Sequence, residues 1–490
     1  MIRTVIHRRF CSLKAKPMRN WPFVERPTLT NALSEVVGAS KAGFHLLNGG
    51  IGSGKSEALY RVVSKRNQLS HSMSNVVIIL DFNHTRPLSE VGAREEFMSY
   101  VVNQISRQIA LQLDPSRLLK LCLDHCHDFG HRFSTYIATK PLWSHITKSC
   151  QSIEESWSRV MNSQSTVAEV LPQIRLTADY HSEVNLFMDI LKSDDAPACL
   201  CLLHTERLGN SLGLLDPFMN PSFNVIIECN DPLTSIWTVC GDDHREWNII
   251  EVNDLPQEAV EKVFVPFLLS DSVQVDTIHR LCAGRVGLLE KFFVPLTTIR
   301  EQQKIKDMEQ EQRYRSGKEN RPSSESKELQ VDPLVYERDV VLRDSLIDGV
   351  LSEETRAFQI AMDKLINESV ATQSLRGSLS RMEYMVFVIE SMKQISDKLQ
   401  SQGSLPLPAS LSPLNIAHPV VLGLFDCGIL MMRWIPFPRI VATSPTSLVQ
   451  MEAWCTSQLE DLPIHERATY NVIAMRNRIH IDRQLDKLSR

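Results

Sequence analysis

The sequence predicts an α/β fold in which a parallel sheet carries helices on both faces. Three observations support this prediction: short apolar runs recur along residues 21–250, helical spacing separates them, and a glycine-rich motif follows the first run. The runs cover residues 43–48, 76–82, 198–203 and 224–229. Runs without alternating polar residues are typical of parallel strands that are buried on both faces. We therefore expect residues 21–250 to form one domain.

The regions outside these strands are predicted to be mainly helical or polar. Phe97, Val101, Ile105 and Ile109 recur at helical spacing in the long gap between the second and third runs. They predict a crossover helix, which is followed by a helical insertion at about 110–190. Residues 301–335 contain few apolar side chains to bury and are expected to form a linker. Residues 336–490 are predicted to form a mainly helical domain.

The composition excludes several classes of protein. With 43% hydrophobic and 23% charged residues, the 490-residue chain can bury a large core. Its net charge of -5 provides no global basic field for nucleic acid. The 11 cysteines are scattered, mostly in apolar runs, which indicates reduced thiols in an intracellular compartment. The apolar stretch at 419–437 is interrupted by Asp426 and Arg433, so we expect no membrane span.

The first 20 residues have the character of a mitochondrial presequence. The first acidic residue is Glu25, and basic side chains such as Arg3, Arg8 and Arg9 precede it. A segment with arginines, hydroxyl groups and no acids is typical of targeting to the mitochondrial matrix. The alternative is a basic tail that carries no address.

A glycine-rich motif follows the first apolar run and precedes a helical pattern. GGIGSGKS at residues 49–56 fits G-x-x-x-x-G-K-[ST] at every fixed position, in the strand–loop–helix context that this P-loop motif requires. Glycines let backbone N–H groups approach phosphate, and the helix N-terminus adds partial positive charge. Lys55 is expected to reach the terminal phosphates, and Ser56 to bind Mg²⁺. The expected nucleotide-binding residues are Gly49, Gly50, Ile51, Gly52, Ser53, Gly54, Lys55, Ser56 and Glu57.

Three further segments resemble those of archaeal-type and STAND P-loop ATPases, which are relatives of AAA+ proteins. FVERPTLTNAL at 23–33 is similar to the box that precedes the P-loop in this family, and Arg26 matches its arginine. VNDLPQEAVEKVF at 252–264 resembles the start of the family's helical lid. IHRLCAGRVGLLEKF at 278–292 resembles the next segment, although Val286 replaces the family's proline.

This resemblance covers residues 21–300 and implies a set of expectations. The cofactors would be ATP, or GTP, with Mg²⁺, and Arg26 would lie near the adenine. Residues 251–300 would form a helical lid, from which Arg285 either approaches the phosphates or faces solvent. No base-specificity motif such as N-K-x-D distinguishes ATP from GTP.

The acidic residues expected to support hydrolysis are incomplete. In the resembled family the third strand ends in Asp-Glu, but here the matching stretch reads CLLHTER. Thr205 stands at the metal-associated Asp, with His204 before it, and Glu206 at the water-activating base. A hydroxyl or imidazole lacks the negative charge that a carboxylate offers to a metal site. Glu206 is a candidate general base or a surface carboxylate, and hydrolysis is expected to be slow or lost.

Polar residues at the ends of two other strands are further candidates. Asn230 follows the fourth run and matches the family's sensor position; the alternative is an Asn that caps the turn before Pro232. Asp81 ends the second run. The resemblance assigns Asp81 no hydrolytic role, but it would serve as the acidic partner in a small-molecule kinase.

Two other segments carry weaker signals. Leu424, Gly428 and Leu430 match the pattern that leads into the β-wing of the winged helix found after the lid in these ATPases. Few basic residues accompany it, so a protein contact is at least as well supported as a nucleic-acid contact. Cys122, Cys126 and the nearby histidines up to His131 could suggest zinc, but the second ligand pair that zinc sites need is missing, and an apolar helix face is preferred.

Together these features predict a nucleotide-dependent switch or ATPase of the AAA+-related, STAND-like type, acting with protein partners in a mitochondrial assembly. The alternative is a structural nucleotide-binding subunit of the mitochondrial ribosome, which the incomplete acidic motif suits. A small-molecule kinase is less well supported, because the predicted lid and winged helix do not belong to that class.

Overall fold

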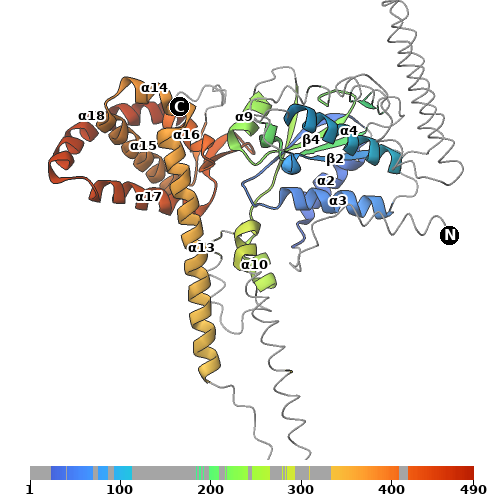
Figure 1. Cartoon of the computed structure of the whole chain (residues 1–490), viewed down its shortest axis with the longest axis horizontal. Helices are drawn as coiled ribbons and strands as arrows, with labels where there is room; N and C mark the ends of the chain where they lie inside the picture. Colours follow the sequence, from blue (N-terminus) through green and yellow to red (C-terminus); the bar gives the residue numbers. More distant parts are fainter. Residues whose placement is uncertain are drawn as a thin grey trace, which may run out of the picture. The chain divides into compact units, whose positions relative to one another are not determined.

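The computed structural model describes residues 24–39, 41–69, 76–85, 93–112, 198–208, 218–240, 245–264, 284–292, 333–407 and 418–489. Eight isolated positions are also described: Val184, Phe187, Met188, Leu191, Asp216, His279, Cys282 and Met308. The chain divides into two compact units. The P-loop unit comprises residues from 26–252, 404–441 and the end of the chain, and the helical unit comprises residues from 253–403 and 442–483 (Figure 1).

Five parallel strands form the centre of the P-loop unit. They are β1 (Gly43–Asn48), β2 (Val77–Asp81), β3 (Cys199–Leu203), β4 (Asn224–Glu228) and β5 (Trp247–Glu251), in the order β2-β3-β4-β1-β5. Adjacent strands pair in parallel, with Leu47 opposite Glu228 and Asn48 opposite Glu251. Four of the strands confirm the apolar runs. The sequence did not predict β5, because this edge strand is only half-buried and lacks a continuous apolar run.

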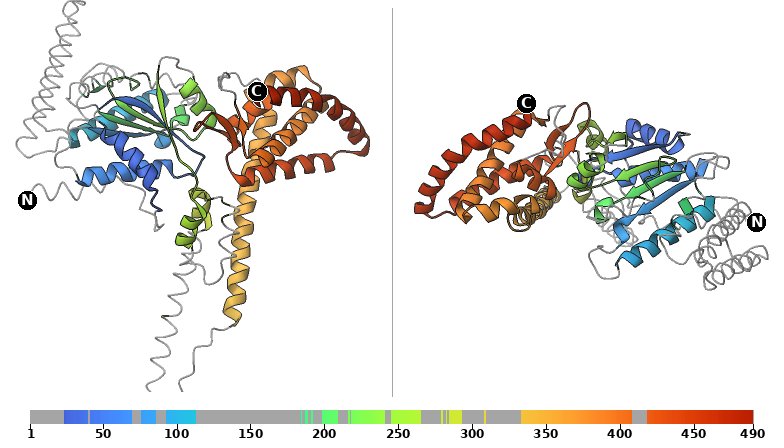
Figure 2. Two further views of the ribbon diagram at one scale, coloured as in Figure 1. Left: turned by 180° about the vertical axis from the view of Figure 1, so that it is seen from behind. Right: turned by 90° about the horizontal axis from the view of Figure 1, so that it is seen from above.

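Helices cover both faces of this sheet, as predicted. The helices α2 (Pro27–Gly38) and α3 (Lys55–Leu69) pack with Leu47, Val77 and Ile226 in one core. On the other face, α4 (Ala93–Gln112) packs with Leu46 and Ile78 (Figures 1 and 2). Neighbouring residues of one strand therefore point into different cores, as the two-residue period of a strand requires. This arrangement confirms the predicted α/β fold class.

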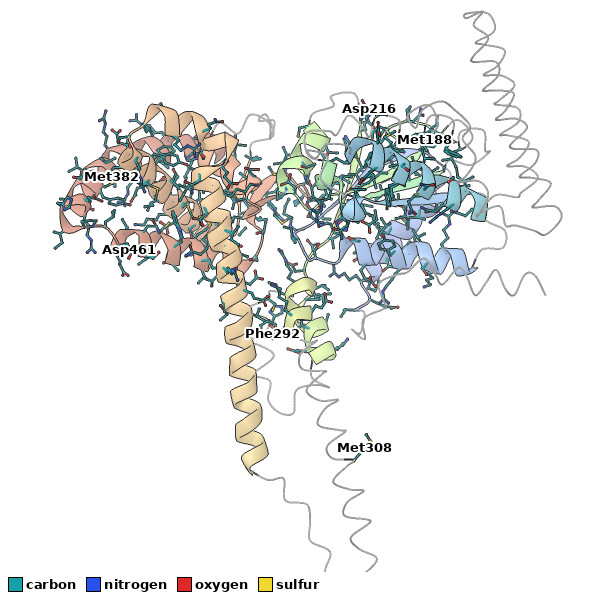
Figure 3. The ribbon with its side chains drawn as sticks, in the orientation of Figure 1. Met188, Asp216, Phe292, Met308, Met382 and Asp461 are labelled. Atoms are coloured by element: carbon teal, nitrogen blue, oxygen red, sulfur yellow. The ribbon has the colours of Figure 1, made fainter. Side chains whose placement is uncertain are left out.

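Four helical positions before β3 are buried in the same core as α4. Val184, Phe187, Met188 and Leu191 recur at helical spacing, are helical and are buried in the same core as α4. Figure 3 labels Met188 on the side of the sheet that α4 covers. Val184, Phe187 and Met188 are the described part of the predicted insertion beyond Gln112, and Leu191 directly follows it.

Two glutamines of α4 complete the hydrogen bonding at the free edge of β2. The side-chain amide of Gln108 bonds to both the N–H and the carbonyl of Ile79, at 2.8 Å each. Gln112 does the same at Val77, with distances of 2.9 and 2.6 Å. An exposed strand edge is a template for aggregation, so α4 both packs on the sheet and closes this edge.

The helical unit begins with the predicted lid region. It contains α10 (Gln257–Phe264) and a helical stretch at 286–292. Leu255 donates its N–H to the carbonyl of Gly284 at 2.8 Å, which joins the two lid segments. Helical segments at 257–264 and 286–292 thus agree with the predicted helical character of this region, whereas residues 252–256 connect β5 to α10 without regular structure.

The described residues 333–407 and 418–489 are mainly helical, as predicted. Its helices are α13 (Pro333–Asn367), α14 (Val370–Ser378), α15 (Arg381–Gln402), α16 (Pro419–Asp426), α17 (Pro445–Glu460) and α18 (Ile464–Ser489). In Figure 3, Met382 marks the start of α15 and Asp461 the end of α17. A small sheet of order β6-β8-β7 is formed by β6 (Leu405–Pro406), β7 (Leu430–Arg433) and β8 (Arg439–Ala442).

The helix α16 and the strands β7 and β8 lie where the wing pattern was expected, and their assignment as a winged helix stays a prediction. The predicted presequence at 1–20, nearly all of the linker at 301–335 and the segment from Cys122 to His131 lie outside the described residues. Within the described part of the chain, no helix is both long and apolar enough to cross a membrane.

Candidate functional site

The P-loop occupies the connection between β1 and α3. Gly52 and Gly54 adopt φ angles of 74° and 85°, in the left-handed region that favours glycine. Ser53 donates its N–H to the carbonyl of Gly50 at 3.1 Å, and Ala58 donates to Gly54 at 3.1 Å as α3 begins. The motif residues therefore form a tight loop that ends at a helix N-terminus, the geometry that favours phosphate.

The lysine of the motif is held inside this loop. Lys55 is only 2% exposed, and its Nζ donates to the carbonyls of Gly49 and Gly50 at 2.6 and 3.1 Å. The side-chain oxygen of Ser53 is also buried and has no hydrogen-bond partner among the described residues. An ammonium group and an unsatisfied hydroxyl within one glycine-rich loop fit an anionic ligand such as phosphate.

Arg26 contacts the P-loop directly. This residue precedes α2, and its Nη2 donates to the carbonyl of Ser53 at 2.7 Å. The arginine of the upstream box thus fixes the middle of the loop, 27 residues further along the chain. Its predicted position near the adenine stays a prediction. Glu57 and Ile51 are exposed, and the carboxylate of Glu57 pairs with Arg61 at 2.6 Å.

The serine that is expected to bind Mg²⁺ faces a carboxylate from β4. Ser56 Oγ donates to Oε1 of Glu228 at 3.2 Å, and Glu228 is fully buried. Sequence reasoning missed Glu228, because the acidic residue was sought on the third strand. The available signal was an acid that directly follows the apolar residues Val225, Ile226 and Ile227 on the neighbouring strand.

The two candidate catalytic residues lie together at the ends of β3 and β4. Glu206 accepts hydrogen bonds from both the N–H and the Nδ2 of Asn230, each at 3.1 Å. His204 joins them, because its Nδ1 lies 3.0 Å from Asn230 Nδ2 and 3.4 Å from Glu206 Oε1. The predicted base and sensor thus form one hydrogen-bonded cluster with an imidazole.

This cluster shifts the protonation of its members. Burial alone would raise the pKa of Glu206, but hydrogen bonds from His204 and Asn230 outweigh it and lower the pKa to about 2. Burial alone would lower the pKa of His204, but Glu206, Glu228 and Asp81 outweigh it and raise the pKa. Glu206 is therefore ionised at neutral pH, as a general base must be, but its lowered pKa makes it a weak base.

The other two strand-end candidates have different partners. The hydroxyl of Thr205 is buried and donates to the carbonyl of Glu228 at 3.2 Å, so it supports β4. Asp81 accepts from the N–H of Asn83 at 3.0 Å and from the hydroxyl of Tyr60 at 2.9 Å. Its carboxylate also lies 3.8 Å from His204 Nε2, at the edge of the same cluster.

Arg285 is held within the lid region. Its guanidinium pairs with both oxygens of Asp254, at 3.1 and 3.0 Å, and the side chain is 6% exposed. A bidentate pair of this kind fixes the direction of the arginine. Its approach to the phosphates stays a prediction.

The donor set at the P-loop suits Mg²⁺ together with phosphate. Ser56 and Glu228 supply the hard oxygen ligands that Mg²⁺ prefers. Within the part of the chain that the structure describes, no group of three His, Cys, Asp or Glu residues is arranged to hold a metal ion unaided. Ser56 and Glu228, at a phosphate-binding loop, fit a cation that also binds the phosphate oxygens of a nucleotide, which is the usual mode for Mg²⁺.

The sequence matches no protein-family model and no curated protein. Among solved structures, similarity is found to the ORC2 protein of Aeropyrum pernix, at 10% identity and a TM-score of 0.36, over 91% of this chain and 98% of the other. Similarity is also found to Cdc6p of Pyrobaculum aerophilum, at 10% identity and a TM-score of 0.32, over 89% of this chain and 96% of the other. A third similar structure is that of the Drosophila ORC bound to DNA, at 11% identity and a TM-score of 0.29, over 87% of this chain and 85% of the other. Similarities this distant decide nothing about function, so the assignment rests on the site.

Proposed function

We propose that this chain binds ATP with Mg²⁺ at the P-loop and acts as a nucleotide-dependent switch of the AAA+-related, STAND-like type. The observation that carries the proposal is the loop itself. Lys55 is buried against the carbonyls of Gly49 and Gly50, and Ser56 faces the Glu228 carboxylate. A cationic group, a hydroxyl and a carboxylate at one helix N-terminus provide a site for phosphates and their cation.

The arrangement favours binding over rapid turnover. Thr205 stands where a carboxylate was expected, and its hydroxyl is engaged by the backbone of β4. Glu206 remains the candidate base, and Asn230 holds both of its oxygens. A base held in this way must exchange partners before it can orient a water molecule, so slow hydrolysis is part of the proposal.

The setting of this switch is proposed from the sequence. The acid-free leader with Arg3, Arg8 and Arg9 supports action in the mitochondrial matrix, within a protein assembly. The lid at 251–300 would change its position with the nucleotide and transmit the change to the later helices. A structural nucleotide-binding subunit of the mitochondrial ribosome is the second candidate, favoured by the missing acid on β3. Co-sedimentation of the protein with ribosomal subunits would support that second candidate over the switch.

The binding of ATP is tested with substitutions on one helix. Lys55→Ala removes an ammonium group from the phosphates, and charged hydrogen bonds of this kind contribute about 1.5–3 kcal/mol, so Kd should rise about 10- to 100-fold. Lys65→Ala is the matched control, because Lys65 is an exposed lysine of the same helix α3. Titration of labelled ATP and GTP with Mg²⁺ measures both variants and identifies the preferred base. Equal affinities for the two variants would refute the proposal.

Hydrolysis is tested separately from binding. If the chain turns over ATP, Glu206→Gln should retain bound ATP unhydrolysed, because the amide cannot accept the proton of the attacking water. Single-turnover assays with quantified ADP distinguish the two proteins. Unchanged turnover in Glu206→Gln would remove Glu206 as the base and leave the binding proposal standing.

A further inference from the structure

The carboxylate of Glu228 lies close to Ser56, whereas the sequence predicted the metal-associated acid at the end of β3. Glu228 is the last residue of β4, which pairs directly with the P-loop strand β1 through Leu47. Its side chain is fully buried, with Oε1 at 3.2 Å from Ser56 Oγ and Oε2 at 3.0 Å from the N–H of His204. The acid therefore lies one strand nearer to the P-loop than the expected position.

The end of β3 offers no substitute for this carboxylate. Thr205 directs its hydroxyl to the backbone carbonyl of Glu228, and not to Ser56. His204 adopts a φ of 57°, which is unusual for a residue with a side chain and costs about 1–2 kcal/mol. In this conformation the N–H of His204 donates to Glu228. His204 and Thr205, at the end of β3, thus support Glu228, and the acid that follows them, Glu206, is hydrogen-bonded to Asn230.

A purely structural role for Glu228 would be expensive. Burying a carboxylate costs several kcal/mol unless partners compensate it. An ionised carboxylate can accept about four hydrogen bonds, and among the described residues Glu228 accepts from one hydroxyl and one N–H, with the ring Nδ1 of His204 3.9 Å from its Oε2. The remaining acceptor capacity lies beside Ser56, the residue whose hydroxyl is expected to bind the cation.

We propose that Glu228 is the carboxylate that organises Mg²⁺ at Ser56, in place of the acid missing from β3. This inference rests on the proposed nucleotide binding. It separates two roles: Glu228 acts on the cation, whereas Glu206, paired with Asn230, acts on turnover if turnover occurs. It also explains how a chain with CLLHTER on the third strand retains a complete site for nucleotide and cation.

The test compares the affinity for ATP in excess Mg²⁺ and in EDTA. Loss of a residue that orients a metal site usually lowers metal affinity about 10- to 100-fold. We therefore expect Mg²⁺ to raise the ATP affinity of Glu228→Gln about 10- to 100-fold less than it raises that of the wild type. In EDTA, the two proteins should bind ATP with similar affinity. Glu246→Gln, an exposed carboxylate just before β5, is the control and should keep the full gain. Mn²⁺ titration by electron paramagnetic resonance, with ATP present, reports the cation directly.

Each outcome decides the inference. The inference would be overturned if Mg²⁺ raised the ATP affinity of folded Glu228→Gln as much as it raises that of the wild type. It would also be overturned if Glu228→Gln lost as much ATP affinity in EDTA as in Mg²⁺, since that result would indicate a role in the shape of the loop. If Glu228→Gln does not fold, Glu228→Asp is the second variant. Its side chain is one methylene shorter, so the carboxylate lies farther from Ser56. Wild-type Mn²⁺ affinity in Glu228→Asp would overturn the inference. If the wild-type protein binds no ATP in either condition, the proposed function has failed, and the metal inference falls with it.

Discussion

Polar side chains at the carboxyl ends of the strands form two hydrogen-bonded groups. Ser56 and Glu228 lie beside the P-loop, whereas Glu206, Asn230 and His204 form a cluster at the ends of β3 and β4. His204 links the two groups, because its N–H reaches Glu228 and its ring reaches Glu206. A change of protonation in this cluster is therefore expected to affect stability.

The contact of His204 with Glu206 predicts a pH window of stability. The pKa of Glu206 is lowered to about 2, so its contribution is present above about 4.5 and is lost as the pH falls toward 2. The pKa of His204 is raised, so its contribution is present below 6.5 and is lost as the pH rises through the folded-state value. The interaction of His204 with Glu206 contributes to both shifts and should be strongest between pH 4.5 and 6.5, whereas the hydrogen bonds from Asn230 to Glu206 persist above this range.

Denaturant titrations of the wild type and Glu206→Gln at several pH values measure this window. The difference in free energy of unfolding should be largest near pH 5.5 and on the order of 3 kcal/mol, from the shift of the Glu206 pKa. It should shrink at pH 3 and again at pH 8. Glu246→Gln, at an exposed carboxylate, is the control. A difference that does not vary with pH would contradict the prediction.

Sequence reasoning at this scale found the loop residues and the candidate pair, but not the serine's partner. The P-loop is contiguous, so its spacing is visible in the chain. Ser56 and Glu228 are 172 residues apart, and only the order of strands brings them together. No local pattern reports which strand lies beside β1.

At the scale of elements, the two lid segments meet at a glycine. Gly284 has a φ of 74°, and its carbonyl accepts the N–H of Leu255. A Cβ at this position would lie 1.8 Å from the carbonyl oxygen of Leu255. Both the backbone conformation and the close approach therefore require glycine here.

Gly284→Ala should destabilise the helical unit by about 2 kcal/mol or more, because the strained φ alone costs about 1–2 kcal/mol and the overlap adds to it. Gly349→Ala is the control: Gly349 lies in α13 with open space around it, and alanine there should stabilise the helix by about 0.5–1 kcal/mol. Thermal unfolding of the three proteins gives the order. A Tm for Gly284→Ala at or above that of the wild type would be inconsistent with the lid contact.

Elements were predictable where their burial is uniform. The continuous apolar runs identified four strands, and the helical spacing identified α4. The edge strand β5 escaped prediction because Trp247–Glu251 mixes polar and apolar side chains on a half-buried strand. The other edge strand, β2, was predicted, because its residues Val77–Asp81 form a largely buried apolar run.

At the scale of the whole molecule, the chain returns to the P-loop unit after residue 403. The strand β7 reaches the carboxyl ends of β1 and β5: Asn48 Nδ2 donates to the carbonyl of Met432 at 3.0 Å. Glu251 accepts from the N–H groups of Trp434 and Ile435, at 2.6 and 3.2 Å. The contact at Asn48 directly precedes the first residue of the P-loop.

Glu251→Ala should therefore loosen the end of β7 and the residues that follow it, Trp434 and Ile435. Two backbone N–H groups would lose their acceptor, and unsatisfied groups of this kind cost about 1–3 kcal/mol when they are not hydrated. Hydrogen exchange at residues 430–435 should become faster, while exchange at β3 stays unchanged. Glu246→Ala, at an exposed carboxylate just before β5, should leave both rates as in the wild type. Unchanged exchange at 430–435 in Glu251→Ala would show that Glu251 does not hold this segment.

The sequence by itself determined the α/β class, the P-loop and the residues that would hold phosphate, because these depend on contiguous spacing and on burial along single strands. The tertiary structure alone decided three contacts: Arg26 with Ser53, Ser56 with Glu228, and Asn48 with Met432. Each depends on which strands and loops become neighbours, and the last joins residues 384 positions apart. Strand order and chain return are set by packing of the whole unit, so a pattern read along the chain does not contain them.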